Sequence, residues 1–178
     1  MGDKAAVAEV SRTRYEDLYR AHYPRIVRLC RLLLRDVGEA EEVAQEVFVK
    51  LLRVSSGLSQ SLAWEAWLTR VAVNACRDRQ RNWWWRRRRE DTMDWQELQL
   101  PSLAPTPEET TLSREQRERI WQSLRHLSAR QREIFVLRYV EGWSGDEVAD
   151  LLGVTSGSVK RHLFRAVQLM RQELGGSL

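Results

Sequence analysis

Hydrophobic side chains recur at steps of three and four residues through most of this chain, and no segment alternates with a period of two. This spacing predicts amphipathic helices rather than strands. In the first half of the chain it predicts three helices, at 14–35, 39–53 and 63–81. Because none of these helices would be stable alone, we expect them to pack as a bundle.

Each predicted helix carries its apolar residues on one side. The first contains Pro24, which should kink or restart the helix because proline removes a backbone donor. The second has glutamates in its first turns, where they favour helix formation. The residues that recur at these steps in the first helix are Tyr15, Leu18, Tyr19, His22, Ile26, Leu29, Cys30 and Leu33. The second helix places Val43, Val47, Phe48, Leu51 and Leu52 on one face, and the third places Trp64, Trp67, Leu68, Val71, Ala72 and Ala75 inward.

The stretch 90–112 differs in composition from the rest of the chain. It holds six acidic residues, no basic residue and three of the four prolines. Since long structureless loops are uncommon inside compact domains, we interpret it as an acidic linker. It would join an N-terminal domain, 10–89, to a C-terminal domain, 113–176. The alternative is an irregular surface loop within one domain.

Capping residues predict where the helices of the C-terminal domain begin. Ser113, with Gln116 three residues later, and Ser128 each precede an amphipathic segment. Gly142 is expected to end the helix that begins after Ser128.

The segment 144–168 has the pattern of a helix-turn-helix. Ser144 caps a short helix, Gly153 supplies a left-handed turn, and Thr155 or Ser156 caps a second helix that runs to the end of the segment. The sequence therefore predicts an all-α fold of two small helical domains, an N-terminal helix bundle and a C-terminal helix-turn-helix bundle, joined by a flexible acidic linker.

The second helix of this motif has one apolar and one basic side. Its apolar residues are Val159, Leu163, Ala166 and Met170, and its opposite side shows Ser158, Lys160, Arg161, Phe164, Arg165 and Gln168. No acidic residue occurs between Asp150 and Glu173. Such a helix fits the major groove of duplex DNA, where phosphates attract it and its side chains read base edges. The alternative is an ordinary helical hairpin with a solvated basic face.

Arginines and tryptophans lie together at the end of the N-terminal domain. Residues 69–89 hold eight arginines and one aspartate. The residues of interest are Asn74, Arg77, Arg81 and Asn82 on a polar flank, followed by Trp83, Trp84, Trp85 and Arg86. Helical neighbours point about 100° apart, so three consecutive indoles cannot all face one core, and at least one should be exposed. Exposed indoles beside guanidinium groups suit unstacked bases of single-stranded DNA. A protein interface has equal weight as an interpretation.

Composition excludes several other classes of protein. The 178 residues carry a net charge of +4, with 43% hydrophobic and 30% charged residues, which is typical of a soluble globular chain. No apolar run approaches the roughly 20 residues that span a bilayer, so we expect a cytoplasmic protein without membrane insertion. We find no metal-ligand spacing, nucleophile–base pair or phosphate loop, and therefore predict neither an enzyme nor a cofactor. Cys30 and Cys76 are interpreted as small core residues.

Taken in this order, the segments resemble a bacterial RNA polymerase sigma factor of the extracytoplasmic-function (ECF) group. The resemblance covers about residues 14–175. Segment 15–34 is similar to the family's opening helices, 36–53 to its core-polymerase-binding helix, 66–81 to its promoter-melting and −10 helix, and 127–166 to its C-terminal helix-turn-helix domain.

The resemblance implies a role for each matched position. Core-polymerase binding falls to Glu42, Gln45 and Glu46, which face the clamp helices of the polymerase's largest subunit. The resemblance implies that one base of the non-template strand is flipped out at the −10 element. The residues implied to bind this single-stranded DNA are Asn74, Arg77, Arg81, Asn82, Trp83, Trp84, Trp85 and Arg86. The −35 element falls to Ser158, Lys160, Arg161, Phe164 and Arg165. The linker would thread toward the active site and the RNA-exit channel.

Two places depart from the family pattern. His162 stands where the family often has an arginine, so a phosphate contact there would be weaker or pH-dependent; a surface histidine without that role is the interpretation we favour. Residues 83–85 are tryptophans in a turn that is commonly basic and polar, which changes the expected −10 preference.

The function implied is a dissociable promoter-specificity subunit. It would bind the clamp helices and flap of core RNA polymerase, recognise duplex and non-template single-stranded promoter DNA, and assist melting. An anti-sigma factor would regulate it and could hold it at the membrane. The alternative is a stand-alone transcription regulator with a helical sensor domain and the same helix-turn-helix, which would bind duplex DNA by itself as a dimer on a palindrome. That alternative leaves Gln45, Glu46 and the three tryptophans without a role.

Overall fold

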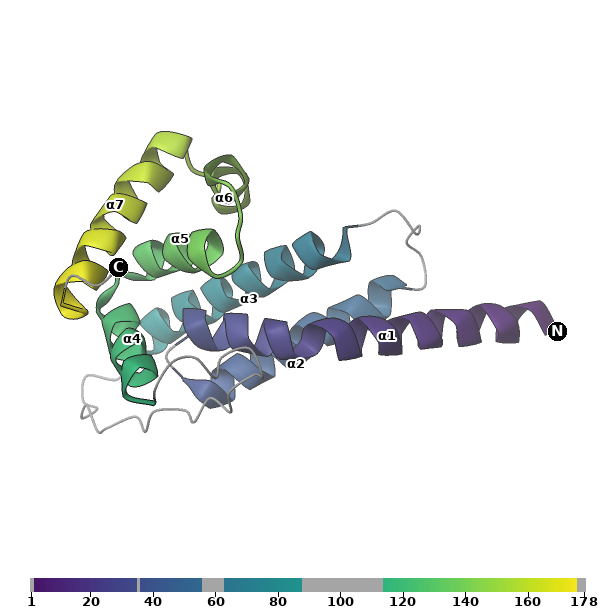
Figure 1. Ribbon diagram of the computed structural model, residues 1–178. Coiled ribbons are helices and arrows are strands. Elements are labelled where there is room, and N and C mark those ends of the chain that lie inside the picture. Colours follow the sequence, from purple (N-terminus) through teal and green to yellow (C-terminus); the bar gives the residue numbers. More distant parts are fainter. Residues whose placement is uncertain (1, 35, 56–62, 88–113, 176–178) are drawn as a thin grey trace. The chain divides into compact units, whose positions relative to one another are not determined.

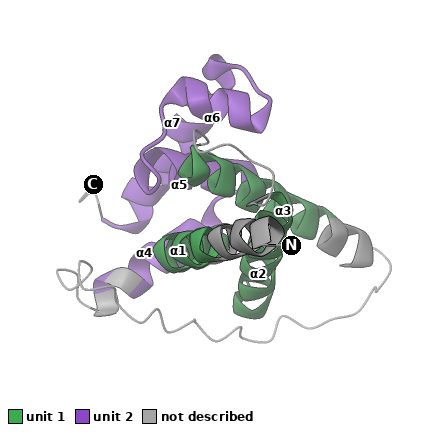
Figure 2. Ribbon diagram, turned by 90° about the vertical axis from the view of Figure 1, so that its right-hand side faces the viewer, with its two compact units in different colours: residues 1–97 green, residues 98–178 purple. Residues whose placement is uncertain are grey.

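The structure is a computed structural model that describes residues 2–34, 36–55, 63–87 and 114–175. Within those ranges every regular element is an α-helix, so the predicted all-α fold class is confirmed (Figure 1). The chain divides into two compact units, 1–97 and 98–178, which are coloured separately in Figure 2. The predicted linker, 90–112, lies outside the described residues.

In the described part of the first unit there are three helices, and each packs against the other two. They are α1 (Gly2–Leu33), α2 (Val37–Ser55) and α3 (Trp64–Arg87). The largest fully buried side chains at their contacts are Ile26, Leu29 and Leu33 of α1, Val43, Val47, Phe48 and Leu51 of α2, and Leu68 of α3. Cys30 and Cys76 are buried in the same core, as their apolar surroundings in the sequence predict.

α1 continues without interruption through Pro24, so the expectation that the helix restarts there is wrong. Proline removes one intrahelical hydrogen bond. However, Ile26 and Leu29 just beyond it are fully buried against the other helices. This burial holds the following turns in the helical conformation.

Leu52 is 53% exposed, so its predicted place in the buried stripe of α2 is wrong. It lies nine residues after Val43, which places it about 180° around the helix from that fully buried side chain. Val49, on the same outer side, is 47% exposed. α2 therefore presents two aliphatic side chains to its surface.

Residues 114–175 of the second unit form four helices: α4 (Arg114–His126), α5 (Ala129–Tyr139), α6 (Gly145–Leu152) and α7 (Ser156–Glu173). α7 packs against the other three. Ser113, the predicted cap of α4, lies outside the described residues, and α4 begins at the residue after it.

The predicted cap of α5 is confirmed and forms a capping box. The Ser128 hydroxyl accepts a hydrogen bond from the Gln131 backbone N–H, and the Gln131 side chain accepts one from the Ser128 N–H. α5 ends at Tyr139 with Val140 as its C-cap residue, so the helix stops slightly before Gly142, the residue that was predicted to end it. Gly142 itself has a φ of 73°, in the left-handed region that glycine favours.

Candidate nucleic-acid and protein interfaces

α6 and α7 form the predicted helix-turn-helix. Ser144 caps α6: its hydroxyl accepts a hydrogen bond from the Glu147 N–H at 3.2 Å, and Glu147 accepts one from the Ser144 N–H at 2.7 Å. The hydrogen bonds from Ser144, the backbone one foremost, lower the pKa of the Glu147 carboxyl. This reciprocal pair fixes the start of α6.

The turn between the two helices depends on Gly153. Its φ of 63° and ψ of 41° lie in the left-handed region, which glycine adopts at little cost. Thr155, rather than Ser156, caps α7, since its hydroxyl accepts from the Ser158 N–H at 3.2 Å. The Ser156 hydroxyl instead donates to Asp146 of α6 at 2.6 Å, which ties the two helices together.

α7 has the two sides that the sequence predicts. Val159, Ala166 and Met170 are buried, while Leu163 is half-buried. The helix runs to Glu173, one turn and more beyond the predicted end at Gln168. The buried Met170 explains the extension, because it anchors the last turns of α7 in the core.

The outer side of α7 brings most of the predicted DNA-reading residues together. Lys160, Arg161 and Arg165 are exposed, and Phe164 between them is 65% exposed. Ser158 is half-buried, and its backbone N–H serves the Thr155 cap. An exposed aromatic ring among three cations can contact apolar base edges while the cations attract phosphates.

α3 carries a second polar side, formed by residues spaced three and four apart. Asn74 and Arg81 are exposed and Arg77 is half-buried. Arg70, one turn before Asn74, is also exposed and belongs to this side, although the sequence analysis did not single it out. The side chains of Asn82, Trp83, Trp84, Trp85 and Arg86 lie outside the described residues, so their roles stay predictions.

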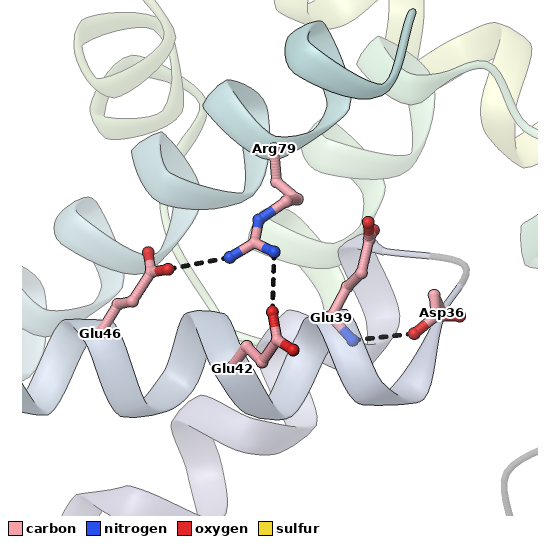
Figure 3. Close-up of polar contacts among 5 residues, drawn as sticks. All are labelled: Asp36, Glu39, Glu42, Glu46 and Arg79. Carbon is pink, nitrogen blue, oxygen red and sulfur yellow. Dashed lines mark hydrogen bonds and ion pairs between the residues drawn. The ribbon is translucent and has the colours of Figure 1, made fainter. Parts of the chain in front are cut away.

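The predicted protein-docking residues lie on the outside of α2. Glu42, Gln45 and Glu46 are all exposed. The start of α2 is fixed by Asp36, whose carboxylate accepts a hydrogen bond from the Glu39 N–H at 2.8 Å (Figure 3).

Arg79 of α3 binds the carboxylates of two of the predicted docking residues, Glu42 and Glu46. Its Nη1 lies 2.9 Å from Glu42 Oε2, and its Nη2 lies 2.8 Å from Glu46 Oε1 (Figure 3). The hydrogen bond with Glu42 is the largest cause of the raised pKa of Arg79. The arginine side chain is 26% exposed, whereas the Glu42 and Glu46 side chains are 65% and 55% exposed.

Arg79 is a residue that the sequence analysis missed. It sits in the arginine-rich stretch 69–89, of which only Arg77, Arg81 and Arg86 were assigned to nucleic acid, and it lies two residues from both Arg77 and Arg81. Two residues correspond to about 200° around a helix, so Arg79 faces the other way. That angular offset is the signal that could have identified it.

Gln45, the third docking residue, is linked to an aromatic cluster between α1 and α2. Its side chain hydrogen-bonds to Tyr23, whose pKa is raised mainly by burial. The Tyr23 ring stacks on Tyr19 with 4.6 Å between centroids, and both rings contact Phe48 edge-on, at 5.4 Å and 5.0 Å. The docking side of α2 is therefore supported by both neighbouring helices.

Within the described part of the chain, no group of three or more acidic, histidine or cysteine side chains is placed to hold a metal ion. None of the described helices has the length and apolar character needed to cross a membrane.

Two family models match the chain. Residues 18–87 match Sigma-70 region 2, and residues 117–170 match Sigma-70 region 4. RNA polymerase sigma factor CarQ of Myxococcus xanthus is 29% identical over 164 residues, which cover 90% of this chain and 89% of that protein. The ECF RNA polymerase sigma factor SigW of Bacillus subtilis is 27% identical over 178 residues, which cover 97% and 91%.

Solved structures show the same fold at low sequence identity. The sigma factor RpoE, in complex with the anti-sigma factor NepR from Bartonella quintana, matches with a TM-score of 0.72 and 19% identity over 93% of this chain and 99% of that one. CnrH, in complex with the cytosolic domain of CnrY, matches with a TM-score of 0.61 and 19% identity over the full length of both chains.

Proposed function

The chain belongs to the ECF group of bacterial RNA polymerase sigma factors, and from this membership we propose which of its residues perform each step of promoter recognition. As a sigma factor it binds core RNA polymerase and directs it to promoters through the −35 and −10 elements for transcription initiation. Its relatives are transcription factors rather than enzymes.

Glu42, Gln45 and Glu46 bind the clamp helices of the polymerase's largest subunit. Their exposure on one side of α2 supports this role, and so does the net negative charge that remains after Arg79 is paired. Carboxylates on a rigid helix are complementary to a basic partner surface and steer its approach.

The polar side of α3 holds the melted non-template strand of the −10 element. Asn74, Arg77 and Arg81 lie on this side in the described structure. Arginines attract the strand's phosphates, and asparagine can pair with the edge of a flipped base. Asn82, Trp83, Trp84, Trp85 and Arg86 extend this surface in our proposal, with the indoles stacking on unpaired bases.

The outer side of α7 reads the −35 element in the major groove. Lys160, Arg161 and Arg165 supply positive charge and hydrogen-bond donors, Phe164 supplies an apolar contact, and Ser158 lies beside them. The C-terminal domain also contacts the polymerase flap.

Binding to polymerase is what makes these weak contacts specific. We assign the boundaries 10–89 and 113–176 to the two domains and 90–112 to the acidic linker that threads toward the RNA-exit channel. When core polymerase holds both domains at the −10/−35 spacing, the second contact becomes intramolecular, so the two affinities combine.

An anti-sigma factor controls access to these surfaces in the cell. The solved relatives RpoE and CnrH are complexes with NepR and with the cytosolic domain of CnrY, respectively. A partner of this kind would cover the docking side of α2 or the outer side of α7. It would act in the cytoplasm, where it could also hold the protein at the membrane.

The observation that carries the proposal is the presence of two separate cation-bearing helix sides, on α3 and α7, together with an acidic docking helix beside the first. Run-off transcription with core RNA polymerase on a genomic fragment library tests it. We expect RNA from defined start sites, and the complete absence of such RNA would overturn the proposal.

A gel shift on duplex promoter DNA separates this function from that of a stand-alone regulator. We expect weak binding by the protein alone and tight binding with core polymerase. Tight binding without polymerase would favour the regulator.

A further inference from the structure

We propose that Arg79 is a positioning residue for polymerase docking, which holds the carboxylates of Glu42 and Glu46 in the orientation that the polymerase binds. The inference rests on the proposed docking role of those two glutamates. The observation behind it is that the Arg79 side chain points from α3 toward Glu42 and Glu46 of α2 (Figure 3).

The guanidinium group of Arg79 bridges the carboxylates of Glu42 and Glu46. Each terminal nitrogen of Arg79 binds a different carboxylate, at 2.9 Å for Glu42 and 2.8 Å for Glu46. The two glutamates lie one turn apart on α2, so a single guanidinium reaches both. Each carboxylate has two oxygens and uses one of them for Arg79, which leaves acceptor capacity for a second cation.

This arrangement reduces the entropic cost of docking. A glutamate side chain that rotates freely in solution loses that freedom when a partner binds it. Arg79 restricts both glutamates beforehand, because its own side chain is anchored on α3 and is only 26% exposed. The three side chains together still carry one net negative charge, which suits a basic partner.

Arg79 therefore differs in role from its neighbours in the sequence. Arg77 and Arg81 lie on the opposite side of α3, about 200° away, and serve the DNA strand in the proposed function. In this proposal α3 contributes to two interfaces: Arg79 supports polymerase docking, and Arg77 and Arg81 contact DNA.

Replacement of Arg79 in the full-length protein tests the inference. The affinity for core polymerase from the source bacterium is measured by fluorescence titration for the wild type, Arg79→Gln and Arg79→Lys. We expect Arg79→Gln to weaken binding about 3- to 10-fold, in line with the freedom regained by the two glutamates. Arg79→Lys keeps the charge but cannot bridge both carboxylates, so its affinity should be intermediate.

A double-mutant cycle distinguishes positioning from a purely structural role. In a Glu42→Gln/Glu46→Gln background, the effect of Arg79→Gln on polymerase affinity should fall to less than about twofold. Arg25→Gln is the matched control. It removes another arginine that joins two helices of this unit, through Thr69 at 3.0 Å and the Glu65 carbonyl at 3.1 Å. It should lower the melting temperature without changing polymerase affinity.

The outcomes separate the two proposals. Unchanged or tighter polymerase binding by Arg79→Gln, full affinity of Arg79→Lys, or an undiminished effect in the double-glutamine background would each overturn the inference about Arg79. Unchanged affinity of the Glu42→Gln/Glu46→Gln protein itself would instead reject the docking role of the glutamates.

Discussion

Asp78 and Arg81 lie one turn apart on the exposed side of α3 and form an ion pair. Asp78 is the single acidic residue between Glu65 and Glu90 in the sequence. It therefore places a negative charge, and holds one of the cations, on the surface that we assign to the −10 strand. A phosphate of that strand must compete with Asp78 for Arg81.

Asp78→Asn should strengthen binding of the polymerase holoenzyme to a −10 non-template oligonucleotide. The substitution keeps the size of the side chain and removes the competing charge, so we expect a gain of about 0.2–1 kcal/mol. The gain should shrink as salt concentration rises. Fluorescence anisotropy with a labelled strand measures it, and Glu16→Gln, which alters an exposed pair with Arg20 on α1, is the control. Equal affinity of Asp78→Asn and the wild type would count against this surface.

Gln45→Ala combined with Glu46→Ala should weaken the capture of core polymerase at least about 10-fold. The change removes one carboxylate and the amide that is linked to Tyr23, while Glu42 can still pair with Arg79. Co-purification with polymerase measures the effect, and Asp17→Asn on α1 is the exposed control. Normal co-purification of the double variant would reject the docking surface.

Arg161→Ala and Arg165→Ala should each cost about 1–3 kcal/mol of −35 recognition if the arginine reads a base. Both side chains are exposed on the outer side of α7. Holoenzyme binding to promoter DNA with and without the −35 element measures the loss. Arg171→Ala, in the last turn of the same helix, should leave recognition unchanged. A loss that is the same on both DNAs would show phosphate contact rather than base reading.

Gly153→Ala should destabilise the second unit by about 1 kcal/mol, because alanine is strained at a φ of 63° even though nothing lies within 4 Å of its added Cβ. Gly157→Ala is the matched comparison. Gly157 lies in the first turn of α7, where alanine is the better helix former and meets only an ordinary contact with Thr155 at 3.9 Å. Thermal unfolding should therefore shift in opposite directions for the two variants, and a shift in the same direction would contradict the role of the turn.

The stability of the first unit should fall as the pH drops below about 6.5. Burial, with the nearby charge of Arg25, lowers the pKa of His22 below its ordinary value of 6.5, against a smaller opposing effect of Glu65. As pH falls, the unfolded chain takes up this proton before the folded one does. The contribution of His22 is thus complete above the unfolded pKa and declines toward the lowered folded pKa.

Thermal unfolding of the wild type and His22→Gln over this pH range measures that contribution. The variant should show a shallower loss of melting temperature in acid. Parallel curves for the two proteins would show that His22 does not carry the effect.

Local rules were enough to predict much of the second unit. Ser144 and Gly153 act through their own backbone neighbourhood, so their cap and turn can be recognised from a few residues of sequence. Leu52 shows the limit of assigning a buried side from three- and four-residue spacing alone. It follows that spacing, yet it lies about 180° around the helix from the buried Val43 and is exposed. Pro24 shows another limit, because burial supplied by distant helices outweighs a local helix breaker.

The docking surface was only half predictable. Glu42 and Glu46 were identified from the resemblance of segment 36–53 to the family's core-polymerase-binding helix, but their partner Arg79 lies more than thirty residues away along the chain. Contacts between helices depend on how those helices pack, and that packing cannot be read from the spacing of residues along each helix. The roles of Trp83, Trp84 and Trp85 remain predictions because their side chains lie outside the described residues.

The alternation of roles along α3 makes the length of this helix as important as its composition. Loss or gain of a single codon between Ala75 and Arg77 would rotate every later side chain by about 100°. The same deletion would turn Arg79 away from Glu42 and Glu46 and turn Arg81 away from the proposed −10 strand. One small change in length would therefore disrupt both interfaces. A substitution in this segment would alter one of the two proposed interfaces, whereas a change in its length would alter both.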